Sequence, residues 1–162
     1  MIKYITEAFE INDDDVLWEK FMCFMRQIIP WEEAQLIQLS SVQIIPVIAF
    51  IYSSEVMGDG HSQFLDLYGV YIKKEDIIDA FKTLSIPKEY IENIEKIPAV
   101  FTPVVELKEN GLGEEKREKE MERINQICDE CDSCFYQYGN EQVDEKIIEY
   151  VRQYHLDFFE YR

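Results

Sequence analysis

Apolar residues recur along most of this chain at the three- and four-residue spacing of amphipathic helices. The clearest run follows the aspartates Asp13 to Asp15 and consists of Leu17, Phe21, Phe24, Met25 and Ile28. Aspartates before such a run provide N-cap chemistry and favour the positive end of the helix dipole. Because Pro30 disfavours helical backbone in the residue before it, the pattern predicts a helix that ends before Pro30.

The same spacing predicts helices over most of the remaining chain. Their expected ranges are 31–39, 42–57, 61–68, 74–84, 86–98, 114–138 and 143–158. The segment 42–57 is largely apolar and is predicted to be the buried central helix, which Gly58-Asp59-Gly60 interrupts. Residues 99–113 contain prolines and glycines and are predicted to be a long loop, with an extended piece at 104–107.

Neither an internal repeat nor a linker divides the sequence. We therefore expect one compact all-α domain over residues 1–162, with about seven to eight helices around the central one. The composition agrees, since 162 residues that are 47% hydrophobic and 14% aromatic can bury a core. No apolar run reaches the roughly 18 residues that a membrane helix requires. The first residues turn acidic without the apolar stretch of a signal peptide, so we expect a cytoplasmic protein.

Acidic residues outnumber basic residues 33 to 16, which gives a formal net charge of −17. Non-specific binding to nucleic acid or to an anionic membrane requires an excess of Lys and Arg, so this charge excludes both. The excess lies near the two ends of the chain. Residues 1–60 hold ten acids against three bases, and residues 128–162 hold nine against three.

Three glutamates of the last predicted helix recur every four residues, which places one carboxylate at roughly every 6 Å of helix axis. The spacing is close to that of successive phosphates along a nucleic-acid strand, roughly 6–7 Å. One hypothesis is therefore a phosphate-like face that binds a basic partner, and the alternative is an ordinary solvated helix face. The candidate partner-binding residues are Glu141, Glu145, Glu149, Asp129, Asp132, Asp13, Asp14 and Asp15.

Cys128, Cys131 and Cys134 have a three-residue spacing that resembles part of an iron–sulfur ligand run. Such runs form loops, whereas the residues here favour a helix, on which Cys128 and Cys134 would lie roughly 120° apart. We therefore expect the cysteines to pack as small hydrophobic residues, with no metal and no cofactor. A protein that binds a metal through these thiols is the alternative.

Glu55, Asp59 and His61 place two acids, a turn and a histidine close together. The set suggests a pocket for acid–base chemistry, and hence a small-molecule-binding or hydrolytic enzyme. A turn between helices is the simpler interpretation. Because the chain lacks a nucleophile elbow, a P-loop and a zinc-protease helix motif, we expect no catalytic residues and no enzymatic activity.

Two stretches resemble domain-of-unknown-function family 4375, which includes a bacterial DNA-mimic protein. In EVMGDGHSQFLDLYG (55–69), the family pattern is matched by Glu55, Val56, Gly60, Gln63 and Phe64. In CDSCFYQY (131–138) and IIEYVRQYHLDFF (147–159), it is matched by Asp132, Phe135, Tyr136, Tyr150, Val151, Tyr154 and Phe158. The likeness spans about residues 40–160. The family pattern has paired asparagines where this chain has Met57 and Gly58, and other residues in place of Asp59 and His61.

The resemblance implies an all-α fold without known catalytic activity and, for one branch of the family, acidic mimicry of duplex DNA. Most of the matched residues are interpreted as structural. Gly60 would permit a turn, Gln63 would bond the backbone freed there, and Phe64 and Phe135 would fill the core. Asp132 and Tyr136 would form a buried polar pair. A small polar pocket formed by Glu55, Gln63, Asp132 and Tyr136 is the alternative.

Taken together, these features predict an acidic, non-enzymatic interaction protein. Its expected partner is a basic protein, either a DNA-binding protein or a nuclease, for which it would compete with nucleic acid. It would not bind nucleic acid directly. The sequence leaves open whether it acts as a monomer or a dimer.

Overall fold

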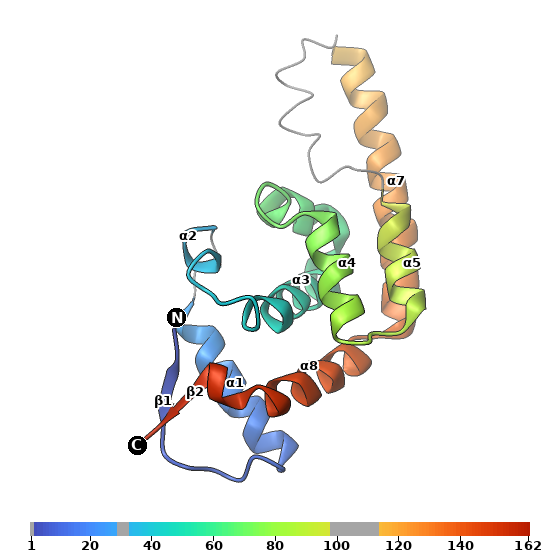
Figure 1. Cartoon of the computed structure of the whole chain (residues 1–162). Helices are drawn as coiled ribbons and strands as arrows, with labels where there is room; N and C mark the ends of the chain where they lie inside the picture. The colour runs from blue at the N-terminus through green and yellow to red at the C-terminus, as the bar shows by residue number, and fades with distance from the viewer. Residues whose placement is uncertain (1, 29–32, 98–113) are drawn as a thin grey trace.

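The computed structural model describes residues 2–28, 33–97 and 114–162, and it confirms the predicted all-α fold (Figure 1). Its helices are α1 (Asp14–Gln27), α2 (Glu33–Leu36), α3 (Ile44–Tyr68), α4 (Lys74–Thr83), α5 (Lys88–Lys96), α7 (Glu114–Tyr138), α8 (Glu141–Gln153) and α9 (His155–Phe158). Two short strands, β1 (Tyr4–Thr6) and β2 (Phe159–Tyr161), complete the described elements. The extended piece predicted at 104–107 and the loop at 99–113 lie outside the described residues, as does the start of the helix predicted at 31–39.

Helix α3 is the buried central helix, as its apolar sequence predicts. Val47, Ala49 and Ile51 are completely buried in it, and the helix contacts α4, α7 and α8. The predicted break at residues 58–60 is narrower than expected, because only Gly60 leaves the helical conformation, with φ 83° and ψ 172°. The chain therefore bends at one residue and continues as helix to Tyr68.

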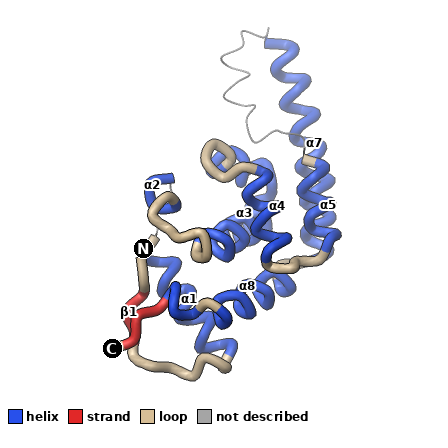
Figure 2. The backbone as a smooth tube through the Cα atoms, in the orientation of Figure 1, coloured by secondary structure: helices blue, strands red, loops and turns tan. Residues whose placement is uncertain are grey.

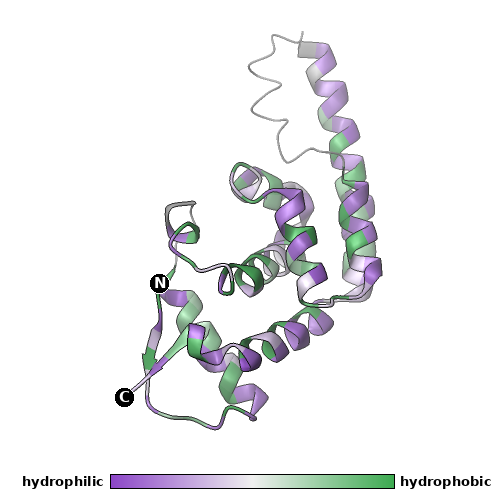
Figure 3. Cartoon of the chain, in the orientation of Figure 1, coloured by the Kyte–Doolittle hydropathy of each residue, from purple (hydrophilic) through white to green (hydrophobic). Residues whose placement is uncertain are grey.

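Helices α5 and α7 lie side by side, and α8 leads from the end of α7 back to α1 (Figure 1). Asp13 caps α1 as predicted, since its side chain accepts a hydrogen bond of 3.1 Å from the backbone N–H of Val16. Helix α7 has the predicted bounds, and its Glu114 end projects beyond the other described helices. Figure 3 shows this end to be largely hydrophilic, in keeping with ion pairs such as that between Lys119 and Glu115.

The C-terminal segment differs from the helix predicted over 143–158. Helix α8 ends at Gln153, and the short α9 is followed by β2, which pairs in parallel with β1 (Figure 2). The side-chain amide of the buried Gln43 joins the same region, because it donates to the carbonyl oxygens of Ile2 and, at 2.7 Å, of Asp157. Local spacing could not indicate this pairing, since its two strands come from opposite ends of the chain.

In the part of the chain that the structure describes, we find no helix with the length and apolarity needed to cross a membrane.

Candidate functional site

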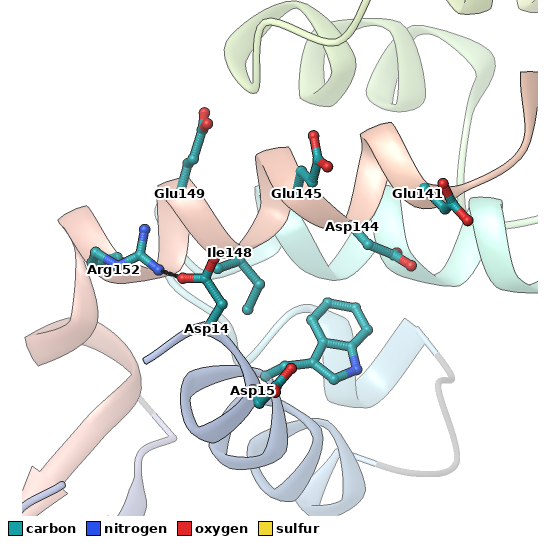
Figure 4. Close-up of a pocket in the computed structure, with 9 residues that line it drawn as sticks. Asp14, Asp15, Glu141, Asp144, Glu145, Ile148, Glu149 and Arg152 are labelled. Atoms are coloured by element: carbon teal, nitrogen blue, oxygen red, sulfur yellow. Dashed lines mark hydrogen bonds and ion pairs between the residues drawn. The ribbon is translucent and has the colours of Figure 1, made fainter. Parts of the chain in front are cut away.

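A groove of about 550 Å³ lies between the first turns of α1 and the outer side of α8 (Figure 4). We call it the α1–α8 groove. Its lining residues are Asp14, Asp15, Trp18, Glu141, Asp144, Glu145, Ile148, Glu149 and Arg152. Six of these nine are acidic, so the groove concentrates carboxylates contributed by two segments that are distant in the sequence.

The helical repeat of α8 places the acids of this wall in two rows. Val143, Ile147 and Val151 are buried against the core, which leaves the opposite side of the helix to solvent. Figure 4 shows Glu145 and Glu149 pointing away from α1, whereas Asp144 lies on the side of α8 nearer to α1. Glu145 and Glu149 thus form an outer rim that Glu141 continues at the start of α8, and we call these three residues the glutamate rim, whereas Asp144 belongs to the inner wall.

Two of the six carboxylates have a basic partner. Arg152 pairs with Asp14, and its Nε also donates at 3.1 Å to the carbonyl oxygen of Ile11. Lys146 pairs with Glu149 at 2.6 Å. No ion pair links the other four, Asp15, Glu141, Asp144 and Glu145, to any residue that the structure describes. The groove therefore has a surplus of negative charge.

Asp144 differs from the glutamates of the rim because it is partly buried. Burial, together with the neighbouring charge of Glu141, raises its pKa from 3.8 to about 6. An ionised carboxylate in this position lacks part of its hydration and has no described cation beside it. Negative charge on the inner wall of the groove is consequently less stable than it would be on a fully exposed carboxylate.

We expect Asp144→Asn to stabilise the protein at neutral pH. Because the pKa is raised on folding, the folded state keeps a proton that the unfolded chain loses between the two pKa values. The contribution of Asp144 to stability is thus largest in acid and is lost as the pH rises through about 6. Since the side chain is partly exposed, we expect a gain of about 1 kcal/mol near pH 7 and almost none near pH 4.

Urea denaturation at both pH values measures this difference. Glu145→Gln, one position further along α8 and exposed, is the matched control and should give no comparable gain. A gain for Asp144→Asn that is equal at the two pH values would contradict the expectation.

Five of the eight acids predicted from the sequence line the groove, namely Asp14, Asp15, Glu141, Glu145 and Glu149. Asp13 is the N-cap of α1, and Asp129 is exposed on α7 and is not among the residues that line the groove. Sequence reasoning missed Trp18, Asp144, Ile148 and Arg152. The last three recur every four residues beside the glutamates, so the same spacing could have indicated them.

The placement of Asp132 corrects its prediction as part of an acidic face. Its side chain is 17% exposed and turns inward, where Oδ1 lies 2.5 Å from Nδ1 of His61 and accepts a 2.8 Å hydrogen bond from the backbone N–H of His61. The other ring nitrogen of His61 lies 2.7 Å from the hydroxyl of Tyr52. Burial raises the pKa of Tyr52 well above 10, so the hydroxyl stays protonated.

The hypothesis of a His61/Glu55/Asp59 pocket is therefore wrong, because the acid that contacts His61 is neither Glu55 nor Asp59. His61 is completely buried and is paired with Asp132. Glu55 accepts a hydrogen bond of 3.2 Å from the hydroxyl of Tyr68, and Asp59 is exposed. The histidine that this alternative placed in a substrate pocket instead joins α3 to α7.

The other matched residues divide into core and surface. Phe64 and Phe135 are completely buried, as predicted. Gln63 is exposed, and no hydrogen bond of its side chain to the backbone is found among the described residues, so the role expected of it is not seen. Tyr136 is 47% exposed, and the buried polar pair of Asp132 with Tyr136 is thus wrong, as is a pocket built on the two. They lie four residues apart on one helix, but only Asp132 faces α3.

The predicted packing role is confirmed for Cys128 and Cys131, which are both buried in the core. Mainly because of burial, the pKa of Cys128 is raised to about 12 and that of Cys131 to about 11. Both side chains are therefore protonated thiols at neutral pH. Cys134 is only partly buried. Among the described residues, no three His, Cys, Asp or Glu side chains are grouped so that they could hold a metal ion.

A family model described as DMP19-like protein matches residues 37–154 of this chain. Neither a curated protein nor a solved structure matches this chain. The matched range includes α8 and the Asp132–His61 pair, but it leaves out α1 with Asp14, Asp15 and Trp18. The name domain-of-unknown-function family 4375 stays a prediction.

Proposed function

This chain belongs to the DMP19-like protein family, and from that premise we propose that it is an acidic, non-enzymatic protein that mimics DNA toward a basic partner. The partner would be a DNA-binding protein or a nuclease, and the α1–α8 groove with its glutamate rim would be the surface that it binds. The proposal does not require direct contact with nucleic acid. Its setting would be the bacterial cytoplasm, where such partners are found.

The observation that carries the proposal is the convergence of carboxylates from α1 and α8. The net charge of −17 could be spread evenly over the surface, in which case it would favour solubility alone. Instead, six acids line one groove, and four of them have no ion pair with a described residue. A concentrated charge of this kind attracts a basic surface over about one Debye length, roughly 8–10 Å at moderate salt.

The test begins with capture of basic proteins on the immobilised chain from a nuclease-treated extract at low salt. A captured protein is identified, purified and used in a binding titration. We expect a short DNA duplex to displace it and added salt to weaken its binding steeply. Binding that does not respond to salt or to DNA would contradict mimicry.

Reversing the charge of the rim should abolish this binding. The triple variant Glu141→Lys, Glu145→Lys, Glu149→Lys places like charges opposite a basic partner, so we expect a loss of roughly 100-fold or more at low salt. The matched control reverses three exposed acids elsewhere, Asp79, Glu95 and Glu122, with the same change in net charge. If both triple variants lose affinity equally, the groove is not the binding surface.

A further inference from the structure

The floor of the α1–α8 groove is aromatic and apolar, unlike a solvated acidic helix face. Trp18 lines the groove, and its ring packs on Phe21 and Phe50 with centroid distances of 5.9 Å. Ile148 lies beside it, with only 6% of its surface exposed. Trp18 is partly exposed, so its indole is held in place by the core and is accessible from the groove.

Asp144 is the carboxylate of the inner wall, and no hydrogen bond or ion pair of its side chain is found among the described residues. A partly buried carboxylate without a partner is unfavourable. A cation that entered the groove would replace the lost hydration with a charge-assisted hydrogen bond. A positively charged donor that entered the groove would thus meet a partly buried carboxylate that has no other described partner.

One end of the same groove already holds a guanidinium group. Arg152 donates to the carboxylate of Asp14 and to the carbonyl oxygen of Ile11. The groove therefore accommodates an arginine head group of this chain's own. Beyond Arg152, the lining continues with Ile148 and Asp144, one and two helical turns earlier on α8.

We propose that the groove between Trp18 and Asp144 binds an arginine side chain of the basic partner, with the guanidinium at the Asp144 carboxylate and against the indole of Trp18. Arginine fits better than lysine, because its planar guanidinium stacks on an aromatic ring and donates two parallel hydrogen bonds to a carboxylate. The inference rests on the proposed function and names the residue type that the groove recognises.

The test uses hexa-arginine amide as the probe and measures its affinity for the full chain by calorimetry at low salt. We expect Asp144→Asn to weaken binding about tenfold, which is typical for the loss of one charge-assisted hydrogen bond. Asp129→Asn, which removes the same charge from an exposed position on α7, should weaken it less than about twofold. Hexa-lysine amide should bind the unmodified chain several-fold more weakly than hexa-arginine amide.

Trp18 is tested with two variants, because its ring also packs on the core. We expect Trp18→Leu to weaken hexa-arginine binding by about two- to fivefold. Trp18→Phe keeps an aromatic ring in the groove and should lose less. Thermal melts followed by circular dichroism show whether each variant is folded. If Trp18→Leu is not folded, the affinity of Trp18→Phe for hexa-arginine amide tests the role of the ring.

Equal losses for Asp144→Asn and Asp129→Asn would overturn the inference, since net charge alone would then explain binding. Equal affinity for the arginine and lysine probes would overturn it as well. Neither outcome affects the proposed function, which depends on the glutamate rim and on displacement by DNA. If the captured partner also fails to respond to reversal of the rim, the proposed function fails with it.

Discussion

Gly60→Ala is expected to destabilise the protein by about 3 kcal/mol. Gly60 has φ 83° and ψ 172°, a combination essentially restricted to glycine, which a residue with a Cβ atom adopts only at a cost of about 1–3 kcal/mol. A Cβ atom at this position would also lie 2.6 Å from Oδ2 of Asp132. The carboxylate would have to move, and its hydrogen bonds to His61 would weaken or break. Urea denaturation followed by circular dichroism measures the change in the free energy of unfolding.

Gly58→Ala is the matched control for this prediction. Gly58 lies two residues earlier in the same helix, is exposed, and has no atom within 4 Å of an added Cβ. Because alanine favours a helix over glycine, we expect this change to stabilise the protein by about 0.5–1 kcal/mol. If the two alanine variants were equally stable, Gly60 would not be constrained by the backbone and by Asp132 as described.

The spacing of apolar and charged residues predicted those features that depend on a single helix, namely its bounds and the side chains that share one of its faces. The bounds of α7, Glu114–Tyr138, agree with the prediction because breakers precede it, Gly139 follows it, and its charged half forms ion pairs three and four residues apart. The glutamate rim was predicted for the same reason. A four-residue repeat keeps Glu141, Glu145 and Glu149 on one side of α8 wherever that helix lies in the fold.

Periodicity could not predict which side chains meet across the fold. The sequence offered two interpretations of Asp132, a surface acid and a buried partner of Tyr136, and neither identified the residue that it contacts. Its acceptor role became visible only with His61 opposite it, 71 residues earlier in the chain. The pairing of β1 with β2 also joins distant parts of the chain. In addition, each strand has only three residues, which are too few to show an alternating pattern.

The groove was predictable in part, because one of its sides follows from spacing within a helix and the other from contact between distant segments. Its outer rim follows from the repeat of α8, but its floor depends on the approach of α1, which brings Trp18 and Asp14 to the same place. The family match begins at residue 37 and does not include α1. The match therefore covers Ile148 of the floor but not Trp18, and it does not test the proposed preference for arginine.

Asp132→Ala is expected to destabilise the protein by about 3 kcal/mol, because it leaves two donors of a buried residue without an acceptor. The backbone N–H of His61 and its Nδ1 both lie within hydrogen-bond distance of Oδ1 of Asp132, at 2.8 and 2.5 Å. Since His61 is completely buried, water can reach these two donors only through the space that the Asp132 side chain leaves. The free energy of unfolding, obtained from urea denaturation, is the measurement.

Asp129→Ala provides the control, because Asp129 lies three residues earlier on α7 and is exposed. Its replacement should change stability by no more than about 0.5 kcal/mol. A double-mutant cycle with His61→Leu then separates the pair from the two single effects. Removing the imidazole also removes one of the donors that Asp132→Ala leaves without an acceptor, so the double variant should lose about 1–2 kcal/mol less than the sum of the single losses. Additive losses would mean that the two side chains do not stabilise each other, and the contact would then position α3 on α7 without contributing to stability.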